Sequence, residues 1–283
     1  MQKLKKIGKY LLPVSVKKTL KYIYYSAQDL IETITGKRDT SYPPKRLNFV
    51  GSSEFKKVGD EFAELFKNKG NLKPEYHILD IGCGIGRMAI PLTKYISEKG
   101  SLNGFDIDKR GVKWCQENIT PKHPNFQFQY VDIFNKYYNK KGQIQAENFT
   151  FPYQNEKFDF IFATSVFTHM LPLQVEQYLK EISRVLKPNG KVFLTFFSID
   201  KTAEENIKNG SAYCTLKYQY GSDPCFYSHK NVPEAEIGFR EEWIKKTFAK
   251  NNLDKNLTIL RGKWSGESHW TSYQDIVIAN KNS

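Results

Sequence analysis

A short turn rich in glycine constrains this chain more than any other feature. The apolar run Tyr76–Ile81 leads into Gly82, Gly84 and Gly86, and Arg87 then opens a predicted helix that extends to about residue 96. Glycine has no Cβ atom, so the backbone of such a turn can adopt positive φ and approach a ligand closely. The pattern predicts a strand, a ligand-binding turn and a helix, in that order.

The spacing of the glycines indicates the kind of ligand. A dinucleotide-binding turn has the pattern G-x-G-x-x-G/A, which brings a pyrophosphate to the amino terminus of the helix. Here Arg87 stands where that pattern has its third small residue, and an acid, Asp80, precedes the turn. The turn therefore favours a ligand that carries no phosphate.

Acidic residues also follow the next two predicted strands. Residues 101–106 read as the second strand, and residues 126–133 alternate like a third strand that ends near Asp132. Asp106, at the end of the second strand, can accept hydrogen bonds from both hydroxyls of a ribose. Asp108 is expected to cap the helix that follows.

The second half of the chain continues this alternation. Residues 158–164 form an unbroken apolar run, suited to a strand buried on both faces, and lead into the loop 165–170. The elements expected next are a helix over 175–186, a turn over 187–190, a strand over 191–197, and an antiparallel pair formed by 257–261 and 275–280. Alternating strands and helices predict a doubly wound α/β sheet.

These motifs resemble those of the class I S-adenosylmethionine-dependent methyltransferases. The resemblance covers about residues 47–281, and it includes the acid-x-G-x-G-x-G turn, the acids after the second and third strands, and the string Arg184–Gly190 before the fifth strand. It implies a Rossmann-like, doubly wound sheet of seven strands, mainly parallel with an antiparallel last strand. It also implies that S-adenosylmethionine is the cofactor.

The resemblance assigns a cofactor site residue by residue. Asp106 would bind the ribose, Asp132 would face the adenine amine, and Ser165 opens the loop after the fourth strand. For Asp80 or Asp106 alone, a role as a simple strand-end cap remains an alternative. The expected cofactor-binding residues are Asp80, Gly82, Gly84, Gly86, Asp106, Asp132, Ile133 and Ser165.

Methyl transfer to a hydroxyl benefits from a base that takes the proton of the acceptor. His169 follows the fourth strand, near the expected position of the transferred methyl group, and is the first catalytic candidate. His229, in the variable region, is the second candidate. The competing interpretation is that His169 only shapes the start of a helix.

Segments outside the shared core are expected to select the acceptor. Residues 198–239 form a predicted substrate insert that is rich in Tyr, Gly, Asp and His, and residues 47–55 occupy the place of a flap. Aromatic faces stack on sugar rings and carboxylates bind hydroxyls, although the same residues could build an ordinary loop core. The whole pattern also resembles methyltransferases of bacterial polysaccharide and glycolipid pathways, which implies O-methylation of a small molecule or glycan.

Other functions remain open. The acceptor could be a lipid, RNA or a protein, or the chain could bind the cofactor without catalysis. Methylation of a nucleic acid base is disfavoured, because the segment after the fourth strand reads Ala163-Thr-Ser-Val166 instead of N-P-P-Y. The intact set of glycines and acids argues against a loss of catalysis.

The net charge of +13 is concentrated near the amino terminus. Residues 1–46 contain nine Lys and two Arg against three acids, a net charge of +8, so the rest of the chain carries only +5. Nucleic acid is therefore not the expected partner of the catalytic domain, and a local anionic surface fits better. We divide the chain into a basic helical arm, 1–46, and a methyltransferase domain, 47–283.

The arm has the pattern of an amphipathic helix over about residues 15–35. Before it, residues 1–12 interleave leucine and isoleucine with lysine, so contact of residues 1–36 with an anionic membrane surface is one hypothesis. For residues 15–35, packing of the helix on the domain or on a second subunit is the favoured interpretation, and for residues 1–12 disorder is the alternative. The apolar stripe comprises Val16, Leu20, Ile23, Ala27, Leu30, Ile31 and Ile34.

The remaining sequence features fit a cytoplasmic protein with peripheral contact at the inner face of a membrane. No apolar stretch reaches the roughly 18 residues of a membrane-spanning helix, and lysines interrupt the segment that a signal peptide would need. The four cysteines form no C-x-x-C pair, so no metal site is predicted. A disulfide between Cys214 and Cys225 is less expected than two free thiols.

Overall fold

The computed structural model describes residues 14–48, 55–221 and 224–283. The chain divides into two compact units, Met1–Val58 and Gly59–Ser283, and each is described by itself. The predicted basic segment 1–12 and residues 49–54 of the predicted flap lie outside the described residues.

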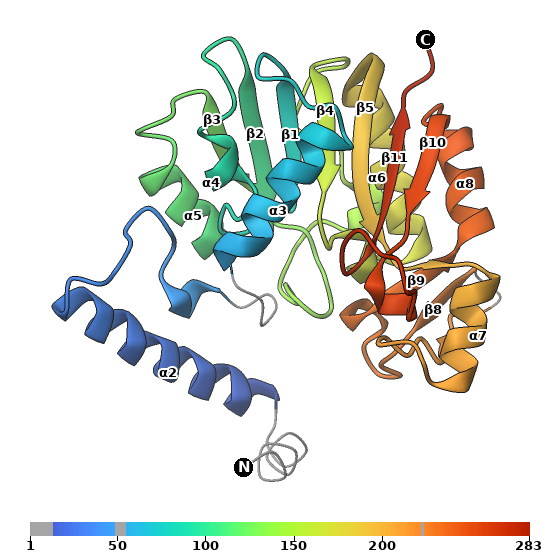
Figure 1. Cartoon of the computed structure of the whole chain (residues 1–283), viewed down its shortest axis with the longest axis horizontal. Helices are drawn as coiled ribbons and strands as arrows, with labels where there is room; N and C mark the ends of the chain where they lie inside the picture. Colours follow the sequence, from blue (N-terminus) through green and yellow to red (C-terminus); the bar gives the residue numbers. More distant parts are fainter. Residues whose placement is uncertain (1–13, 49–54, 222–223) are drawn as a thin grey trace. The chain divides into compact units, whose positions relative to one another are not determined.

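A seven-stranded sheet forms the centre of the larger unit (Figure 1). Its order is β10-β11-β5-β4-β1-β2-β3, and β11 runs antiparallel to both of its neighbours. The strands are β1 His77–Ile81, β2 Ser101–Asp106, β3 Phe126–Tyr130, β4 Phe158–Ala163, β5 Leu186–Phe196, β10 Lys255–Leu260 and β11 Asp275–Asn280. The predicted Rossmann-like sheet, mainly parallel with an antiparallel last strand, is confirmed.

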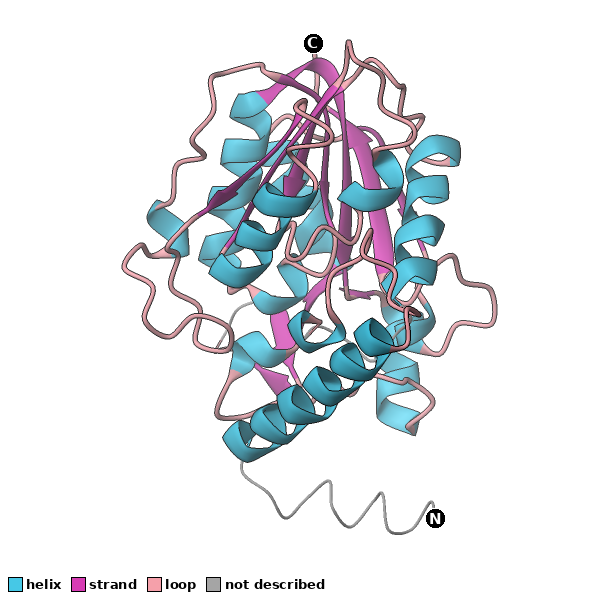
Figure 2. Ribbon diagram, turned by 90° about the vertical axis from the view of Figure 1, so that its left-hand side faces the viewer, coloured by secondary structure: helices cyan, strands magenta, loops and turns pink. Residues whose placement is uncertain are grey.

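Helices lie on both faces of this sheet (Figure 2), because parallel neighbours require crossover connections. The α-helices are α3 Phe55–Asn68, which spans the boundary between the units, α4 Ala89–Leu92, α5 Lys109–Asn118, α6 Pro172–Val185, α7 Lys201–Asn209 and α8 Glu241–Lys250. The short 3-10 helices are η2 Ala146–Asn148, η3 Phe167–His169, η4 Pro233–Ala235 and η5 Lys263–Ser265. Asp108 caps α5 as predicted, since its side chain accepts a hydrogen bond from the N–H of Arg110.

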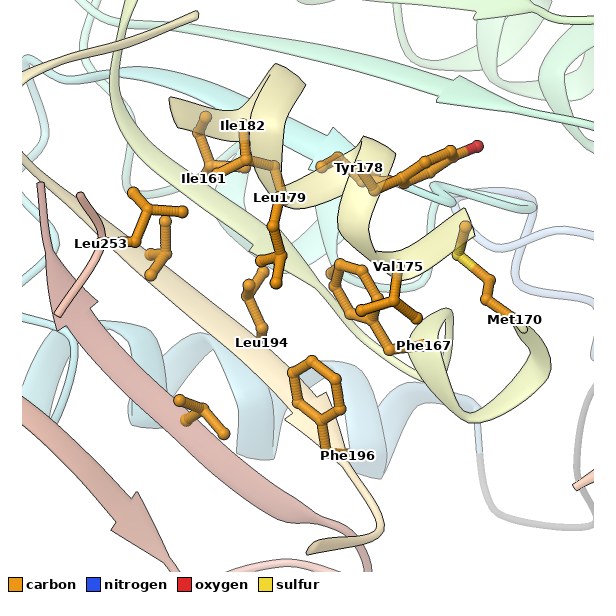
Figure 3. Close-up of a cluster of buried hydrophobic side chains, with 14 of the residues drawn as sticks. Ile161, Phe167, Met170, Val175, Tyr178, Leu179, Ile182, Leu194, Phe196 and Leu253 are labelled. Atoms are coloured by element: carbon orange, nitrogen blue, oxygen red, sulfur yellow. The ribbon is translucent and has the colours of Figure 1, made fainter. Parts of the chain in front are cut away.

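The main core lies between the sheet and α6. Figure 3 shows Leu179 of α6 beside Leu194 of β5 and Val175 of α6 beside Phe167 of η3, and all four are fully buried. Complete burial of a side chain of this size contributes about 1.5–3 kcal/mol. This packing holds the carboxyl ends of β4 and β5 in place, and η3 begins four residues after the last residue of β4.

Two predicted boundaries are wrong. The helix expected from Arg87 to residue 96 is reduced to α4. It starts late because Pro91 cannot donate the hydrogen bond that a regular helix makes to the carbonyl of residue 87, and after α4 the N–H groups of Lys94 and Tyr95 bond carbonyls only three residues back. The turn expected over 187–190 lies within β5, where Asn189 adopts φ +60° and the pairing with β4 shifts its register. An irregularity in the strand thus takes the place of a separate turn.

The predicted substrate insert contains a second, smaller sheet of order β6-β9-β8-β7. Its strands are β6 Ser198–Ile199, β7 Tyr218–Gln219, β8 Cys225–Tyr227 and β9 Ile237–Arg240. Buried Phe197, Cys214, Leu216 and Trp264 belong to the core beneath it, and both Cys214 and Cys225 are free thiols. Since β6 begins only two residues after the end of β5, the insert is joined directly to the carboxyl end of a central strand.

The smaller unit is built on α2, Val14–Ile34, so the predicted amphipathic helix is confirmed. Asp29 of α2 is buried and accepts hydrogen bonds from the backbone N–H groups of Lys45 and Arg46 and from the guanidinium groups of Arg38 and Arg46. These bonds tie α2 to η1, Lys45–Leu47. Among the described helices, none combines the length and the apolar character needed to cross a membrane.

Candidate cofactor and acceptor site

The glycine turn and Asp106 lie together because β1 and β2 are neighbours in the sheet. Gly82, Gly84 and Gly86 adopt φ of +76°, +53° and +76°. The N–H of Gly84 donates to Oδ2 of Asp106 at 2.7 Å, and the N–H of Asp108 donates to Oδ1 at 2.6 Å. Burial raises the pKa of Asp106 to about 6, although these N–H donors act in the opposite direction.

Asp80 lies on β1 just before the turn and is 1% exposed. Neither of its carboxylate oxygens has a hydrogen-bond partner among the described residues. Burial raises its pKa well above the ordinary value, and the charge of Asp106 raises it further. A buried carboxylate without a donor is costly, so this position favours a ligand that brings positive charge or N–H groups.

Asp132 and Ile133 follow β3. Asp132 accepts hydrogen bonds from the Tyr130 hydroxyl at 2.7 Å and from Asn139 Nδ2 at 3.3 Å, and both donors reach Oδ1. The Tyr130 bond lowers the pKa of Asp132 and keeps it ionised. Ile133 is buried in the main core, so its side chain packs against protein atoms there. Contact of these two residues with adenine stays a prediction.

Ser165 follows β4 in a constrained conformation. It adopts φ +58°, unusual for a residue with a Cβ, and its N–H donates to the Thr195 hydroxyl at 2.7 Å. Its hydroxyl bonds Gln274 Oε1 at 3.2 Å, and Gln274 Nε2 reaches the Thr168 hydroxyl at 3.4 Å. Thr195 and Gln274 were not found by sequence reasoning, because they come from β5 and from the residue before β11.

His169 ends η3 and is held by contacts from two other segments. Its Nδ1 lies 2.9 Å from the carbonyl oxygen of Glu234 in η4, and its Nε2 lies 3.3 Å from the Tyr138 hydroxyl. A carbonyl can only accept, so Nδ1 carries the proton and Nε2 holds the lone pair. Burial lowers the pKa of His169, while the bond to Glu234 and the charge of Glu236 oppose the shift.

Two further groups join His169 from outside its own loop. Asn135 donates from Nδ2 to the His169 carbonyl at 3.0 Å, and the ring of Tyr137 stacks on the imidazole with centroids 6.3 Å apart. Tyr137 and Tyr138 belong to the loop after β3, and no motif in the sequence marks them. The structure therefore brings together the loops after β3 and β4 and η4 of the insert.

The two histidine candidates differ in burial and in the contacts of their ring nitrogens. His229 is exposed in a turn after β8, whereas His169 is partly buried with both ring nitrogens engaged. Glu236, also in the insert, accepts a hydrogen bond from the Ser228 hydroxyl, and its charge acts on both His169 and Tyr273. His169 thus has a fixed tautomer, and the charge of Glu236 acts to raise its pKa. Among the described residues, no cluster of His, Cys, Asp and Glu could hold a metal ion.

Comparison with known proteins identifies the domain. Residues 79–194 match a family model described as a methyltransferase domain. The ubiquinone/menaquinone biosynthesis C-methyltransferase of Wigglesworthia glossinidia brevipalpis is 28% identical over 57% of this chain and 60% of that protein. The human tRNA N(3)-cytidine methyltransferase is 23% identical over 79% of this chain and 54% of that protein. The chain thus spans little more than half the length of these relatives.

A solved structure shares the fold. A protein of Pyrococcus horikoshii OT3 superimposes with a TM-score of 0.55 at 15% identity, covering 83% of this chain and 95% of that chain. At this level of identity the similarity shows the fold alone, which agrees with the strand order described above.

The residues present fit S-adenosylmethionine, which carries an ammonium, a sulfonium and a ribose but no phosphate. Asp80 offers a buried carboxylate without a partner, and Asp106 offers an acceptor at the end of β2. A Cβ atom at Gly84 would meet only Asp106 Oδ2 within 4 Å, at 3.9 Å, so the space beside the turn is open. With the domain matched over residues 79–194 and the fold, these features show that the chain carries a class I S-adenosylmethionine-dependent methyltransferase domain.

Proposed function

We propose that this protein transfers a methyl group from S-adenosylmethionine to a hydroxyl of a small polar acceptor, with sugars and glycans as the first class to test. The observation that carries the proposal is the tautomer of His169. Because Nδ1–H is bonded to the Glu234 carbonyl, Nε2 presents its lone pair as a base. The lowered pKa of His169 keeps that base neutral at physiological pH.

Different residues of the chain would bind the cofactor and accept the proton. Asp80, Asp106 and the glycine turn would hold the cofactor, which supplies an electrophilic methyl group when bound. His169 Nε2 would take the proton of the acceptor hydroxyl as the new O–C bond forms and the S–C bond breaks. Tyr138, whose hydroxyl lies 3.3 Å from Nε2, would orient the lone pair until the acceptor hydroxyl takes its place.

A polar acceptor is supported by the surroundings of His169. Glu236 and Ser228 supply a carboxylate and a hydroxyl from the insert, and Tyr138 adds a phenol. Carboxylates and hydroxyls bind the hydroxyl groups of sugars. The names of the two relatives above refer to quinone and tRNA methylation. The acceptor class that we propose is therefore argued from the residues of this chain alone.

The test is a labelled transfer assay. We would incubate the purified protein with S-adenosylmethionine carrying a deuterated methyl group and with panels of monosaccharides, lipid-linked sugars, quinones and tRNA, and detect the product by mass spectrometry. A deuteromethyl ether on a sugar hydroxyl is the expected product. Transfer to carbon or to a base nitrogen instead would overturn the acceptor class while leaving the family assignment intact.

The role of His169 has its own test. With the identified acceptor, His169→Ala should lower kcat by about a hundredfold or more and leave cofactor affinity unchanged, because the base acts on the acceptor's proton. His123→Ala, in the turn before β3, is a matched control that should turn over at the wild-type rate. Wild-type kcat in His169→Ala, together with a large loss in His229→Ala, would move the base to the exposed histidine of the insert.

A further inference from the structure

The smaller unit folds with the apolar face of its helix outward. Leu20, Ile23, Leu30, Ile31 and Ile34 are 52%, 58%, 60%, 60% and 76% exposed. Their spacing places all five on one stripe of α2, since positions three and four residues apart share a face. An exposed stripe of five large apolar side chains on a single helix requires an explanation.

Among the described residues of the arm, the hydrogen bonds and ion pairs that hold the fold lie on the opposite side of the helix from this stripe. Asp29, about half a turn away from the stripe, is 2% exposed and binds Arg38 and the backbone of Lys45 and Arg46. Glu32 pairs with Lys45. The polar face of α2 therefore holds the segment that leads to η1.

The same ion pairs leave the arm strongly cationic. Both acids of α2, Asp29 and Glu32, are neutralised by residues of the arm. Residues 1–46 contain eleven basic and three acidic residues, and Lys45 and Arg46 keep 47% and 41% of their side chains exposed even though they are paired. The arm, residues 1–46, thus combines an exposed apolar stripe with a net charge of +8.

We propose that α2 docks on an anionic lipid surface, with the stripe at the boundary between headgroups and acyl chains and the basic residues close to anionic headgroups. Charge complementarity selects this occupant, because a protein partner or a second copy of this cationic chain would need its own acidic face. Helices of this kind bind through apolar area together with attraction to anionic lipid. That attraction extends only over a Debye length of roughly 8 Å at physiological salt.

The experiment is sedimentation of the full chain with phosphatidylcholine vesicles, with and without phosphatidylserine. Binding is expected to the anionic vesicles only, and a high-salt wash should release most of the protein because the attraction is screened. Leu30→Glu is expected to reduce binding at least about tenfold, because it places a charge in the apolar stripe. The matched control is Leu173→Glu on α6, a leucine outside the arm that is 69% exposed against 60% for Leu30, and this variant should bind like the wild type.

A second variant tests the charge without altering the stripe. Replacing Lys17, Lys18 and Lys21 by Gln should weaken binding to anionic vesicles, because attraction falls with each basic residue removed. Circular dichroism of each variant shows whether the helix is retained. A variant that keeps its helix content and loses vesicle binding supports the proposal.

Three results would overturn the proposal. The first is wild-type protein that ignores anionic vesicles even at low salt. The second is equal binding to neutral and anionic vesicles, which would remove the charge argument. The third is a concentration-dependent dimer that Leu30→Glu converts to monomer without any vesicle binding, since the occupant would then be a second copy of the chain.

Discussion

The cofactor end of the candidate site and the end around His169, where we propose that the acceptor binds, are built in different ways. At the cofactor end, Asp80 and Asp106 lie on adjacent strands and Gly84 lies in the turn after the first of them, and the bond from the Gly84 N–H to Asp106 joins residues only 22 positions apart. At the acceptor end, His169 meets Glu234 and Ser165 meets Gln274, which are 65 and 109 positions away. The first region is a local motif, whereas the second exists only once the insert and the last strands are folded.

This difference shows where substitutions should act. A change in the local motif alters ligand binding while the sheet stays intact. A change in a long-range tie at the acceptor end should loosen the fold, because those ties also position β6 and the loop before β11.

Asp275→Ala is expected to have the largest effect. The buried carboxylate of Asp275 accepts hydrogen bonds from the N–H groups of Gly262 and Ser198 and from Trp264 Nε1, at 2.7, 2.7 and 2.6 Å. Alanine would leave three buried donors without partners, at about 1–3 kcal/mol each, so the free energy of unfolding should fall by about 3 kcal/mol or more. Chemical denaturation measures this loss. Asp60→Ala, on the surface of α3, should stay within about 0.5 kcal/mol of the wild type.

Asp106→Ala tests the cofactor end. It removes the expected acceptor of both ribose hydroxyls, and hydrogen bonds to a charged group contribute about 1.5–3 kcal/mol, so the affinity for S-adenosylmethionine should fall more than tenfold in calorimetry. Asp108→Ala is the control, because it weakens the cap of α5 but keeps the backbone N–H that bonds Asp106. Equal affinity in the wild type and in Asp106→Ala would contradict the placement of the ribose.

Protonation of Asp106 should make cofactor binding depend on pH. Its pKa is raised to about 6 by burial, so in the free protein the carboxylate gains a proton as the pH falls through that value. Since the ionised form is the better acceptor for ribose hydroxyls, affinity should decrease by up to about tenfold between pH 7.5 and pH 5. Calorimetry across this range checks the slope. Asp106→Asn, which cannot titrate, should flatten it.

Two glycines of the same turn offer the finest comparison. A Cβ atom at Gly82 would lie 2.5 Å from Val166 Cγ2, whereas at Gly84 it would meet only Asp106 Oδ2 at 3.9 Å. Both positions have positive φ, so alanine strains the backbone by about 1 kcal/mol at either one. Gly82→Ala should additionally lower the melting temperature through the clash, and Gly84→Ala should additionally weaken cofactor binding. If Gly82→Ala weakened cofactor binding and Gly84→Ala lowered the melting temperature, the cofactor would not lie beside Gly84.

The sequence by itself was enough to predict the seven-stranded sheet and the glycine turn that follows β1. Runs such as Phe158–Ala163 are apolar at nearly every position because both faces of a central strand are covered, and the glycines mark positions that need positive φ. It failed at the start of α4, where Pro91 removes one backbone donor. It also failed at 187–190, where the pairing with β4 shifts its register from Leu186 to Lys191 and the residues between belong to an irregular part of β5.

Only the tertiary structure decided the acceptor end. A histidine in a sequence shows neither its tautomer nor its neighbours, and His169 acquired both from Glu234 and Tyr138 in other segments. The outward apolar stripe of α2 was likewise decided by folding, because the periodicity fixes which residues share a face, while the bonds of Asp29 determine which face the arm covers. Local patterns depend on residues that are close in the sequence and can be recognised there, whereas contacts between distant segments depend on how the whole chain packs.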